Sequence, residues 1–397
     1  MGIRLTNPHL KSILWIDPHL EYRSPTMKHL LYSLPYLKKQ GWTIKAWCLR
    51  SDIPPSQVEQ VRLPYPFELG PFENLYFSII VNLLWLIRLL FRIPPPASII
   101  HATGGTCMGA NLITLQFLHT RWISIQHRIG FSSVEEMLRF LLSLSDLALE
   151  RLQLKSNCLQ RISTVSTAIS RLTKKVANRN LPIDTLPNSY DETRFNTSVR
   201  ALYRAPMRDN LKLSERDIAF IFVSQGHFRR KGLWLAIRAL QKLRLDGNRR
   251  LKLLIVGGNS RAIRQLRSQL CKEVSDWEDW ILLLGMQKNP EHFYAAADAF
   301  LFPSFFEAFC LAEIEAAACG LPLLLTRHPG SEMILKNGKN GTFLSFNVNI
   351  MSQQIDSFLA RGVKTFEASI GRAMTRDQYA SRLEKIYTDH LAFLNKE

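Results

Sequence analysis

Short apolar runs alternate with stretches of helical periodicity along most of the chain. In residues 1–200, the apolar runs predict strands at residues 12–16, 43–49, 97–101, 122–126 and 162–165. In the remainder, they predict strands at residues 218–224, 251–256, 281–284, 299–302 and 321–325. Strands that read as continuous apolar runs are typical of parallel sheets with both faces covered. The pattern therefore predicts parallel sheets in both halves of the chain.

Segments in which apolar positions recur every three or four residues lie between these runs. They predict helices at residues 26–39, 133–155, 166–176, 233–243, 290–297 and 308–318, and an amphipathic helix over the last 25 residues. Strands that alternate with helices indicate a parallel sheet covered by helices. The fold class predicted by this alternation is α/β.

The length of the chain indicates more than one domain. A chain of 397 residues exceeds what one hydrophobic core usually supports, and a polar stretch at residues 196–214 separates its halves. We predict two doubly wound domains that face each other, at residues 1–205 and 206–372. The helix at residues 373–397 is expected to pack back on the N-terminal domain. Ligands of such sheets bind at the carboxyl ends of the strands, so the predicted site is the cleft between the domains.

Residues 77–91, FSIIVNLLWLIRLLF, form an unusually apolar segment. At 15 residues with Arg88 inside, the segment is too short and too charged to span a bilayer, which takes about 20 apolar residues. One interpretation is a helix buried against the sheet. The other is a helix in the membrane interface, with Trp85 at the level of the headgroups and Arg88 and Arg92 against anionic lipid.

The composition excludes several classes of protein. At 46% hydrophobic and 21% charged residues, the chain is too apolar for a disordered protein. Its six cysteines form no CxxC pair, which argues against a zinc knuckle and favours a reducing compartment. Residues 1–14 lack the apolar core of a signal peptide. These observations predict a cytoplasmic protein.

The net charge of +18 predicts an anionic partner. Residues 1–200 hold 23 Lys and Arg against 13 Asp and Glu, so the excess is not confined to a tail. Nucleic acid is not a predicted partner, because the chain has no zinc-finger spacing and no aromatic RNP-type motif. An anionic bilayer and a phosphorylated ligand remain, and the bilayer would place the protein at the inner face of the cytoplasmic membrane.

A basic loop follows the first predicted strand of the second half, with the sequence SQGHFRRKG at residues 224–232. Gly226 allows the chain to turn close to a ligand, and Arg229, Arg230 and Lys231 stand just ahead of the next predicted helix. A diphosphate is bound well by bidentate guanidinium groups together with a compact ammonium charge. The loop is therefore a candidate diphosphate site, with a solvated basic turn as the alternative.

Two glutamates, Glu307 and Glu315, lie eight residues apart in the segment FFEAFCLAEIEAAACGLPLLL. Gly320 and then Pro322 would end the intervening helix. With Glu307 at the helix start, the free N–H groups of residues 308–311 would face the cleft and suit an anionic or polyhydroxyl ligand. Ionised carboxylates accept hydrogen bonds from sugar hydroxyls. The spacing alone also fits a glutamate pair on a solvated helix face.

These residues resemble the glutamate-seven-glutamate motif of the family-four retaining glycosyltransferases. The similarity extends over residues 218–345 and, more faintly, into the N-terminal half, and it is carried by Glu307, Phe309, Glu315, Gly320, Leu321 and Pro322. The resemblance implies the GT-B fold, with two facing Rossmann-like domains. It also implies that Glu307 contacts the donor sugar, that Glu315 binds the ribose, and that the arginines and lysine of the basic loop neutralise the diphosphate.

The resemblance implies a fuller set of site residues. His127, in Gln126-His127-Arg128 at the end of a predicted strand, is similar to the family histidine that contacts the donor sugar, and Gly257 to the element that lines the nucleotide pocket. The catalytic residues implied are His127, Arg229, Lys231 and Glu307. The donor-binding residues implied are Gly226, Arg230, Gly257, Ala308, Phe309, Cys310, Leu311 and Glu315. No essential metal or cofactor is expected, and the chain has no DxD motif.

The function expected from the resemblance is the retaining transfer of a sugar from a nucleotide-diphosphate-sugar to a hydroxyl. A glycan or lipid-linked acceptor in cell-envelope polysaccharide or glycolipid synthesis fits the apolar segment and the basic surface. The family usually has glycine where this chain has Ala308 and Cys310. The alternative is therefore a catalytically degenerate GT-B protein that acts as a nucleotide-sugar-binding or partner subunit.

Overall fold

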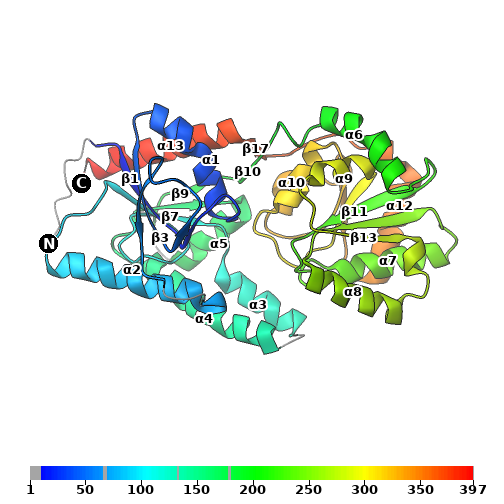
Figure 1. The fold of residues 1–397 in the computed structure, drawn as a ribbon, viewed down its shortest axis with the longest axis horizontal. Helices are drawn as coiled ribbons and strands as arrows, with labels where there is room; N and C mark the ends of the chain where they lie inside the picture. The colour runs from blue at the N-terminus through cyan, green and yellow to red at the C-terminus, as the bar shows by residue number, and fades with distance from the viewer. Residues whose placement is uncertain (1–9, 66–68, 132–133, 178–179, 397) are drawn as a thin grey trace. The chain divides into compact units, whose positions relative to one another are not determined.

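The computed structural model describes residues 10–65, 69–131, 134–177 and 180–396. They form two compact units, an N-terminal unit of Met1–Ser189 with Met374–Glu397 and a C-terminal unit of Tyr190–Ala373 (Figure 1). The chain thus enters the C-terminal unit after Ser189 rather than at the predicted residue 205. The short strands β10 (Ser189–Tyr190) and β17 (Met374–Thr375) lie where the chain passes between the units. Residues 1–9, part of the segment considered as a signal peptide, lie outside the described residues.

The N-terminal unit is built on a seven-stranded parallel sheet in the order β5-β3-β1-β6-β7-β8-β9. Its strands are β1 (Ser12–Ile16), β3 (Thr43–Cys48), β5 (Glu59–Arg62), β6 (Ile99–Thr103), β7 (Leu112–Leu115), β8 (Arg161–Thr164) and β9 (Ile183–Thr185). A separate short pair is formed by β2 (His19–Leu20) and β4 (Arg50–Ser51). The strand order reverses between β1 and β6, and such a switch point is where doubly wound sheets bind ligands.

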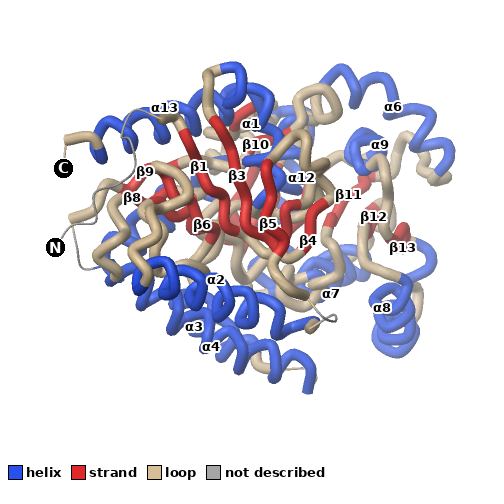
Figure 2. The backbone as a smooth tube through the Cα atoms, turned by 60° about the vertical axis from the view of Figure 1, so that its left-hand side comes forward, coloured by secondary structure: helices blue, strands red, loops and turns tan. Residues whose placement is uncertain are grey.

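Helices cover both faces of this sheet. They are α1 (Met27–Lys39), α2 (Glu73–Leu90), α3 (His119–Ile129), α4 (Val134–Lys155), α5 (Thr167–Ala177) and α13 (Arg376–Leu394). Figure 2 shows α1 and α13 on one face and α2, α3 and α4 together on the other. The helix predicted from residue 133 begins at Val134, and residue 133 lies outside the described residues.

The C-terminal helix α13 belongs to the core of the N-terminal unit. The indole nitrogen of Trp15 donates to the hydroxyl of Tyr387 at 3.0 Å, and that hydroxyl lies 2.7 Å from Nδ1 of His101. Burial lowers the pKa of His101 to about 3, so the imidazole is neutral. Because Tyr387 donates to Nδ1, the ring proton sits on Nε2, which donates to Thr114 Oγ1 at 2.7 Å. His101 is therefore a structural residue.

Two expectations for the N-terminal unit are wrong. Residues 122–126 lie within helix α3 and not in a strand. The strand nearby is β7, which ends four residues before α3 begins and was not predicted; β5 and β9 were not predicted either. The two apolar runs have similar lengths, and periodicity does not distinguish strand from helix in so short a run. Residues 77–91 form most of α2, but this helix is not buried, since only 17% of its most apolar window is enclosed.

The C-terminal unit repeats the doubly wound plan with a six-stranded parallel sheet in the order β13-β12-β11-β14-β15-β16. Its strands are β11 (Ile218–Val223), β12 (Leu251–Val256), β13 (Ile281–Gly285), β14 (Ala299–Phe302), β15 (Leu323–Thr326) and β16 (Gly341–Leu344). Its helices are α6 (Thr197–Asn210), α7 (Leu233–Leu245), α8 (Ser260–Glu273), α9 (Pro290–Ala296), α10 (Leu311–Ala318), α11 (Ser331–Ile334) and α12 (Val348–Arg361). Here the switch point lies between β11 and β14.

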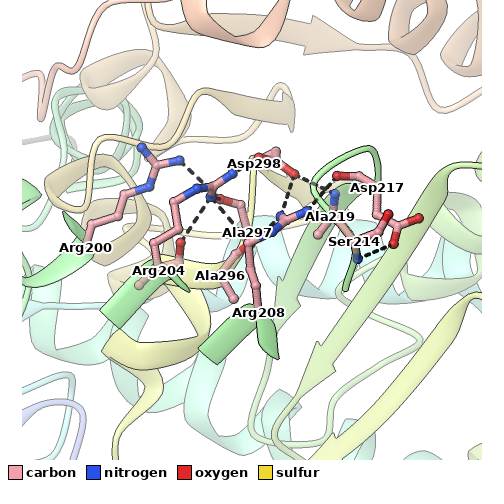
Figure 3. Close-up of polar contacts among 10 residues, drawn as sticks. Arg200, Arg204, Arg208, Ser214, Asp217, Ala219, Ala296, Ala297 and Asp298 are labelled. Atoms are coloured by element: carbon pink, nitrogen blue, oxygen red, sulfur yellow. Dashed lines mark hydrogen bonds and ion pairs between the residues drawn. The ribbon is translucent and has the colours of Figure 1, made fainter. Parts of the chain in front are cut away.

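The polar stretch expected to separate the domains is the helix α6, which packs against α9. Asn196 caps its start. Arg204 and Arg208 contact the carboxylate of Asp298 at 2.5 and 3.2 Å and donate to carbonyl oxygens at the end of α9, among them that of Ala296 (Figure 3). Cations there complement the negative end of the helix dipole. The segment is polar because its arginines fix it to the C-terminal unit.

Replacing Asp298 by Ala should destabilise the C-terminal unit, because Arg204 and the buried Arg208 lose their shared carboxylate. We expect a loss of about 3–5 kcal/mol in the free energy of unfolding measured by urea denaturation. Arg249→Ala is the matched control, since it breaks an exposed pair with Asp276 and should cost less than about 1 kcal/mol. Equal, small effects of both substitutions would contradict the role given to Asp298.

Candidate active site

The loops that follow β11 and β14 meet at the switch point of the C-terminal sheet. The loop after β11 carries the basic sequence, and the loop after β14 carries Glu307. The carbonyl oxygen of Arg230 accepts a hydrogen bond from the backbone nitrogen of Phe305 at 3.1 Å. Two segments about 75 residues apart in sequence are thus joined through their backbones.

Lys231 and Glu307 form an ion pair across this junction. The ammonium group of Lys231 contacts Oε1 of Glu307, and the two side chains are only 13% and 10% exposed. The hydroxyl of Ser304 donates to the same oxygen at 3.1 Å. Burial raises the pKa of Glu307, but the charges of Lys231 and Arg230 outweigh it and bring the pKa below its ordinary value. Glu307 is therefore ionised and can only accept hydrogen bonds.

Glycines allow the loops around this pair to approach closely. Gly232 has φ +74°, and a Cβ atom there would lie 2.0 Å from the carbonyl oxygen of Pro303. Gly257, after β12, has φ +104°, and a Cβ atom there would lie 1.9 Å from the carbonyl oxygen of Ser224. Only glycine fits at both positions. The loops after β11, β12 and β14 therefore gather at one edge of the sheet, with Gly226 in the first of them.

The segment between the two glutamates differs from the expectation. Helix α10 begins at Leu311, with Cys310 as its N-cap residue in an extended conformation, so Glu307 to Cys310 form a loop and not the first helical turn. The free N–H groups accordingly start at Leu311. Ala308 and Phe309 are buried in this loop, and the carbonyl oxygen of Glu307 accepts from Gly330 N at 3.2 Å.

Glu315 lies on α10, further along the chain than the loop that holds Glu307. Its side chain is half-buried, and its Oε2 accepts a hydrogen bond from the hydroxyl of Tyr294 at 3.2 Å. In the basic loop, the side chain of Arg229 is exposed and that of Arg230 is half-buried. The structure thus places every predicted donor-binding residue in the loops at this edge of the sheet or on α10.

One buried pair next to this loop was missed by sequence reasoning. Nε2 of His328, which follows β15, lies 2.8 Å from Oε1 of Glu313 on α10, and both side chains are fully buried. Nδ1 of His328 accepts a hydrogen bond from the backbone nitrogen of Ser331 at 3.2 Å. Because Nδ1 accepts, the ring proton is on Nε2, the nitrogen nearest the carboxylate. The pair anchors the first turn of α10 directly after the Glu307 loop.

The N-terminal unit contains a polar pocket of about 370 Å³ at its own switch point. The residues that follow β1, β6 and β7 line it, together with side chains from α2 and α4; its polar lining includes Asp17, His19, Glu73, Asn74, Thr103, Gln116, His119 and Asp146. Ligands of doubly wound sheets bind at this edge. Among the described residues, no three His, Cys, Asp or Glu side chains gather closely enough to hold a metal ion.

Asp17 lines this pocket and is 4% exposed. Its carboxylate accepts hydrogen bonds from the Thr103 hydroxyl, from the Thr26 hydroxyl at 3.0 Å and from His19 N at 2.8 Å. Burial raises the pKa of Asp17 despite these bonds. The pocket thus offers a fixed carboxyl oxygen to a polar ligand.

His119, not His127, stands beyond the end of a strand and at the pocket. His127 lies within α3 with an exposed side chain, so the expectation that it follows a strand is wrong. Nδ1 of His119 lies 3.0 Å from the buried carboxylate of Glu150, and its Nε2 lies 3.7 Å from Asp146. The signal was present in the sequence LITLQFLH, where a four-residue apolar run precedes this histidine.

Comparison with known proteins bears on the family and the fold. Residues 204–373 match the model of the family "Glycosyl transferases group 1". A curated relative is the N-acetylgalactosamine-N,N'-diacetylbacillosaminyl-diphospho-undecaprenol 4-alpha-N-acetylgalactosaminyltransferase of Campylobacter jejuni, 32% identical over 162 residues. The match covers 40% of this chain, which spans only about two fifths of that relative, 42% of its length.

Solved structures resemble nearly the whole chain. Sucrose-phosphate synthase from Thermosynechococcus elongatus superposes with a TM-score of 0.72 at 17% identity, covering 96% of this chain and 99% of that one. WaaG, a glycosyltransferase involved in lipopolysaccharide biosynthesis, superposes with a TM-score of 0.69 at 17% identity, covering 95% and 99%. At such low identity these likenesses show the fold, which is the GT-B fold of two Rossmann-like domains. The match to the group 1 glycosyl transferases lies in residues 204–373, nearly all of them in the C-terminal unit.

Proposed function

We propose that this protein transfers a sugar from a nucleotide-diphosphate-sugar to a hydroxyl acceptor, with retention of the anomeric configuration. The observation that supports this most directly is the buried Lys231–Glu307 pair at the switch point of the family domain. A cation for the diphosphate and an ionised carboxylate for the sugar hydroxyls lie side by side, next to the two arginines of the basic loop.

The donor would bind along the loops of the C-terminal unit. Arg229, Arg230 and Lys231 would take the diphosphate, with the N-terminus of α10 as a further source of positive potential. Glu307 would accept hydrogen bonds from the sugar, and Glu315 from the ribose. Cations placed where the leaving diphosphate gains charge stabilise the transition state electrostatically, which is usually the largest catalytic effect. No metal is required for that step in this proposal.

The acceptor would bind in the polar pocket of the N-terminal unit. Its lining offers carboxyl oxygens, an amide and an imidazole, which suit a ligand rich in hydroxyl groups. His119, which also lines this pocket, would contact the donor sugar, the role that the family resemblance implied for His127. The Campylobacter relative is named for transfer to an undecaprenol-diphosphate-linked sugar. By analogy we propose a lipid-linked or other cell-envelope glycan as the acceptor.

The second candidate function is a nucleotide-sugar-binding subunit without catalysis. It is favoured by the two side chains, Ala308 and Cys310, that fill the loop after Glu307 and are 6% exposed each. Incubating the purified protein with a panel of nucleotide sugars separates the two functions. A transferase releases nucleoside diphosphate slowly from its donor even without acceptor, whereas a binding subunit retains the donor intact.

A double-mutant cycle on Lys231 and Glu307 should separate stability from catalysis. Lys231→Met leaves a buried carboxylate unpaired and should lower the free energy of unfolding by about 3–5 kcal/mol. Lys231→Met combined with Glu307→Gln should recover most of that loss. Donor hydrolysis should nevertheless fall by about a hundredfold or more in both variants, because the diphosphate loses its ammonium group. Hydrolysis that recovers with stability would contradict the donor site.

The same cycle predicts a pH dependence. Because the folded pKa of Glu307 is lowered, its contribution to stability is complete above the ordinary pKa of glutamate, 4.5, and is lost as the pH falls through the lowered pKa. The stability difference between wild type and the double variant should therefore be constant at neutral pH and shrink only in acid. A difference that shrinks near neutrality would contradict the assigned pair.

Replacing His119 and His127 separately should show which of the two histidines takes part in donor turnover. His119→Ala should lower the rate of donor turnover at least about tenfold, the effect of one lost hydrogen bond of about 1.4 kcal/mol in the transition state. His127→Ala is the matched control, since the same residue type is exposed on the same helix. Steady-state rates with the preferred nucleotide sugar provide the measurement, and a larger loss in the control would contradict the assignment of His119.

Removing divalent cations should leave donor hydrolysis unchanged, because the cationic side chains of the basic loop are proposed to neutralise the diphosphate. The rate is measured before and after dialysis against EDTA, with Mg²⁺ and Mn²⁺ added back separately. A rate that collapses in EDTA and returns with either ion would contradict metal-independent departure of the diphosphate.

A further inference from the structure

Helix α2 turns an apolar face away from the protein. Ile79, Leu83 and Leu90 are 57%, 51% and 68% exposed. Their spacing of four and then seven residues places them on one stripe of the helix, and the exposed Leu86 and Ile87 fall on the same stripe. The buried residues of α2, which include Phe77 and Val81, lie on the opposite side. Water-soluble surface helices have the reverse arrangement.

Helix α4 shows the same inversion. Val134, Leu141 and Leu152 are 78%, 54% and 59% exposed, and seven and eleven residues separate successive members, so they follow one stripe. Met137, Leu138 and Leu144 are also exposed along this stripe. Glu150 and Leu154, on the other side of the helix, are buried.

The two helices lie side by side on one face of the N-terminal unit (Figures 1 and 2). Each directs its buried side toward the body of the unit, so both apolar stripes point outward. We call these stripes together the α2–α4 surface; its members are Ile79, Leu83, Leu86, Ile87, Leu90, Val134, Met137, Leu138, Leu141, Leu144 and Leu152. Exposed apolar side chains gathered on two neighbouring helices mark a site that binds a protein or a membrane.

The charges around the α2–α4 surface are mostly basic. Arg92, just after α2, and Arg139, Arg151 and Lys155 on α4 have exposed side chains. Of the acidic side chains on α2 and α4 that the structure describes, those of Glu73 and Glu150 are buried, Asp146 lines the polar pocket and Glu136 is half-buried. An apolar stripe flanked by cations is typical of helices that lie in the interface of an anionic bilayer.

We propose that the α2–α4 surface docks on a bilayer containing anionic lipid, with both helices parallel to the membrane plane. Gly70–Leu90 is long and apolar enough to cross a membrane, by length and composition only. It is nevertheless fixed to the protein, because Glu73 contacts Arg50 at 2.9 Å and His19 at 3.1 Å and Phe77 is fully buried. The helix therefore rests on the membrane rather than spanning it.

The structure differs from the membrane contact expected from the sequence at Trp85 and Arg88. The ring of Trp85 packs so closely on Gly109 that a Cβ atom there would lie 1.8 Å from it, so this half-buried ring contacts the protein. Arg88 donates to the carbonyl oxygen of Pro94 at 2.5 Å. The apolar contact is made by the leucines and isoleucines of α2, and the cations come chiefly from α4 and Arg92.

A second copy of this chain fits the surface less well. A two-fold dimer places the same patch against itself, so the basic residues of one copy would face those of the other. Unit charges of like sign repel at such distances, and the net charge of +18 adds to the repulsion. An anionic lipid surface instead supplies the counter-charge.

The docked helices also line the polar pocket of the N-terminal unit. Glu73, Asn74 and Ser78 come from α2, and Asp146 and Leu149 come from α4. If the pocket binds the acceptor, a step that rests on the proposed function, a lipid-linked acceptor can keep its lipid in the bilayer while its polar head enters the pocket. Docking then limits the search for the acceptor to the membrane surface.

Vesicle co-sedimentation tests the docking surface. The full chain is mixed with vesicles of phosphatidylglycerol and phosphatidylcholine in equal parts, or of phosphatidylcholine alone, at low and high salt. We expect binding to the anionic vesicles, weakened by salt because part of the attraction is electrostatic. Leu83→Gln with Leu90→Gln, and Leu141→Gln with Leu152→Gln, should each weaken binding about tenfold or more.

The matched control is Leu202→Gln with Leu245→Gln, which removes two leucines that are 67% and 70% exposed on α6 and α7. This variant should bind vesicles as wild type does. All these leucines are exposed, so the variants should fold, which circular dichroism checks. No wild-type binding at low salt, or equal binding by all variants, would overturn the proposal. So would a dimer in solution that the α2 and α4 substitutions dissociate.

Donor hydrolysis without vesicles separates this proposal from the proposed function. The α2 and α4 variants should hydrolyse the donor at the wild-type rate, because none of the substituted leucines belongs to the donor site or the polar pocket. Binding to vesicles without hydrolysis of any nucleotide sugar would support the docking surface and contradict the proposed transferase activity. Hydrolysis of the donor without binding to anionic vesicles would support the transferase activity and contradict the docking surface.

Discussion

The buried ion pair between Lys231 and Glu307 is the interaction on which the proposed donor site depends. A carboxylate that is 10% exposed stays ionised only if a cation compensates for its lost hydration, and Lys231 supplies that charge from a neighbouring loop. The same contact fixes the position of the ammonium group beside the arginines of the basic loop. A diphosphate bound at this loop would contact an ammonium group that Glu307 already holds in position. Lys231 would then pair with two anionic groups, the carboxylate and the diphosphate.

The two units share one fold plan but place different chemical groups at their switch points. Each has a doubly wound parallel sheet, and each gathers polar groups where the strand order reverses. In the C-terminal unit these groups are cationic and packed tightly by glycines, as an anionic ligand requires. In the N-terminal unit they are carboxyl, amide and imidazole groups around a pocket of about 370 Å³, which suit hydroxyl groups. The buried Glu313–His328 pair holds the start of helix α10 next to the loop of Glu307.

Much of the fold could be predicted from the sequence, and the exceptions have physical causes. Strands such as β11, β12 and β14 are continuous apolar runs buried on both faces, so their ranges agree within a residue. Helix α6 was missed because its arginines bind carbonyl groups of α9, a contact that local sequence does not reveal. The sequence left two interpretations of residues 77–91 open, because average hydropathy does not record which side of a helix faces the protein. His328 and Glu313 lie 15 residues apart, so their contact exists only in the folded chain.

A crystal structure with a bound nucleotide sugar tests the donor site most directly. The proposed site predicts diphosphate oxygens within hydrogen-bonding distance of the ammonium group of Lys231, with hydroxyls of the sugar on the carboxylate of Glu307. A nucleotide bound elsewhere, or a diphosphate that leaves Lys231 in contact with Glu307 alone, would contradict it.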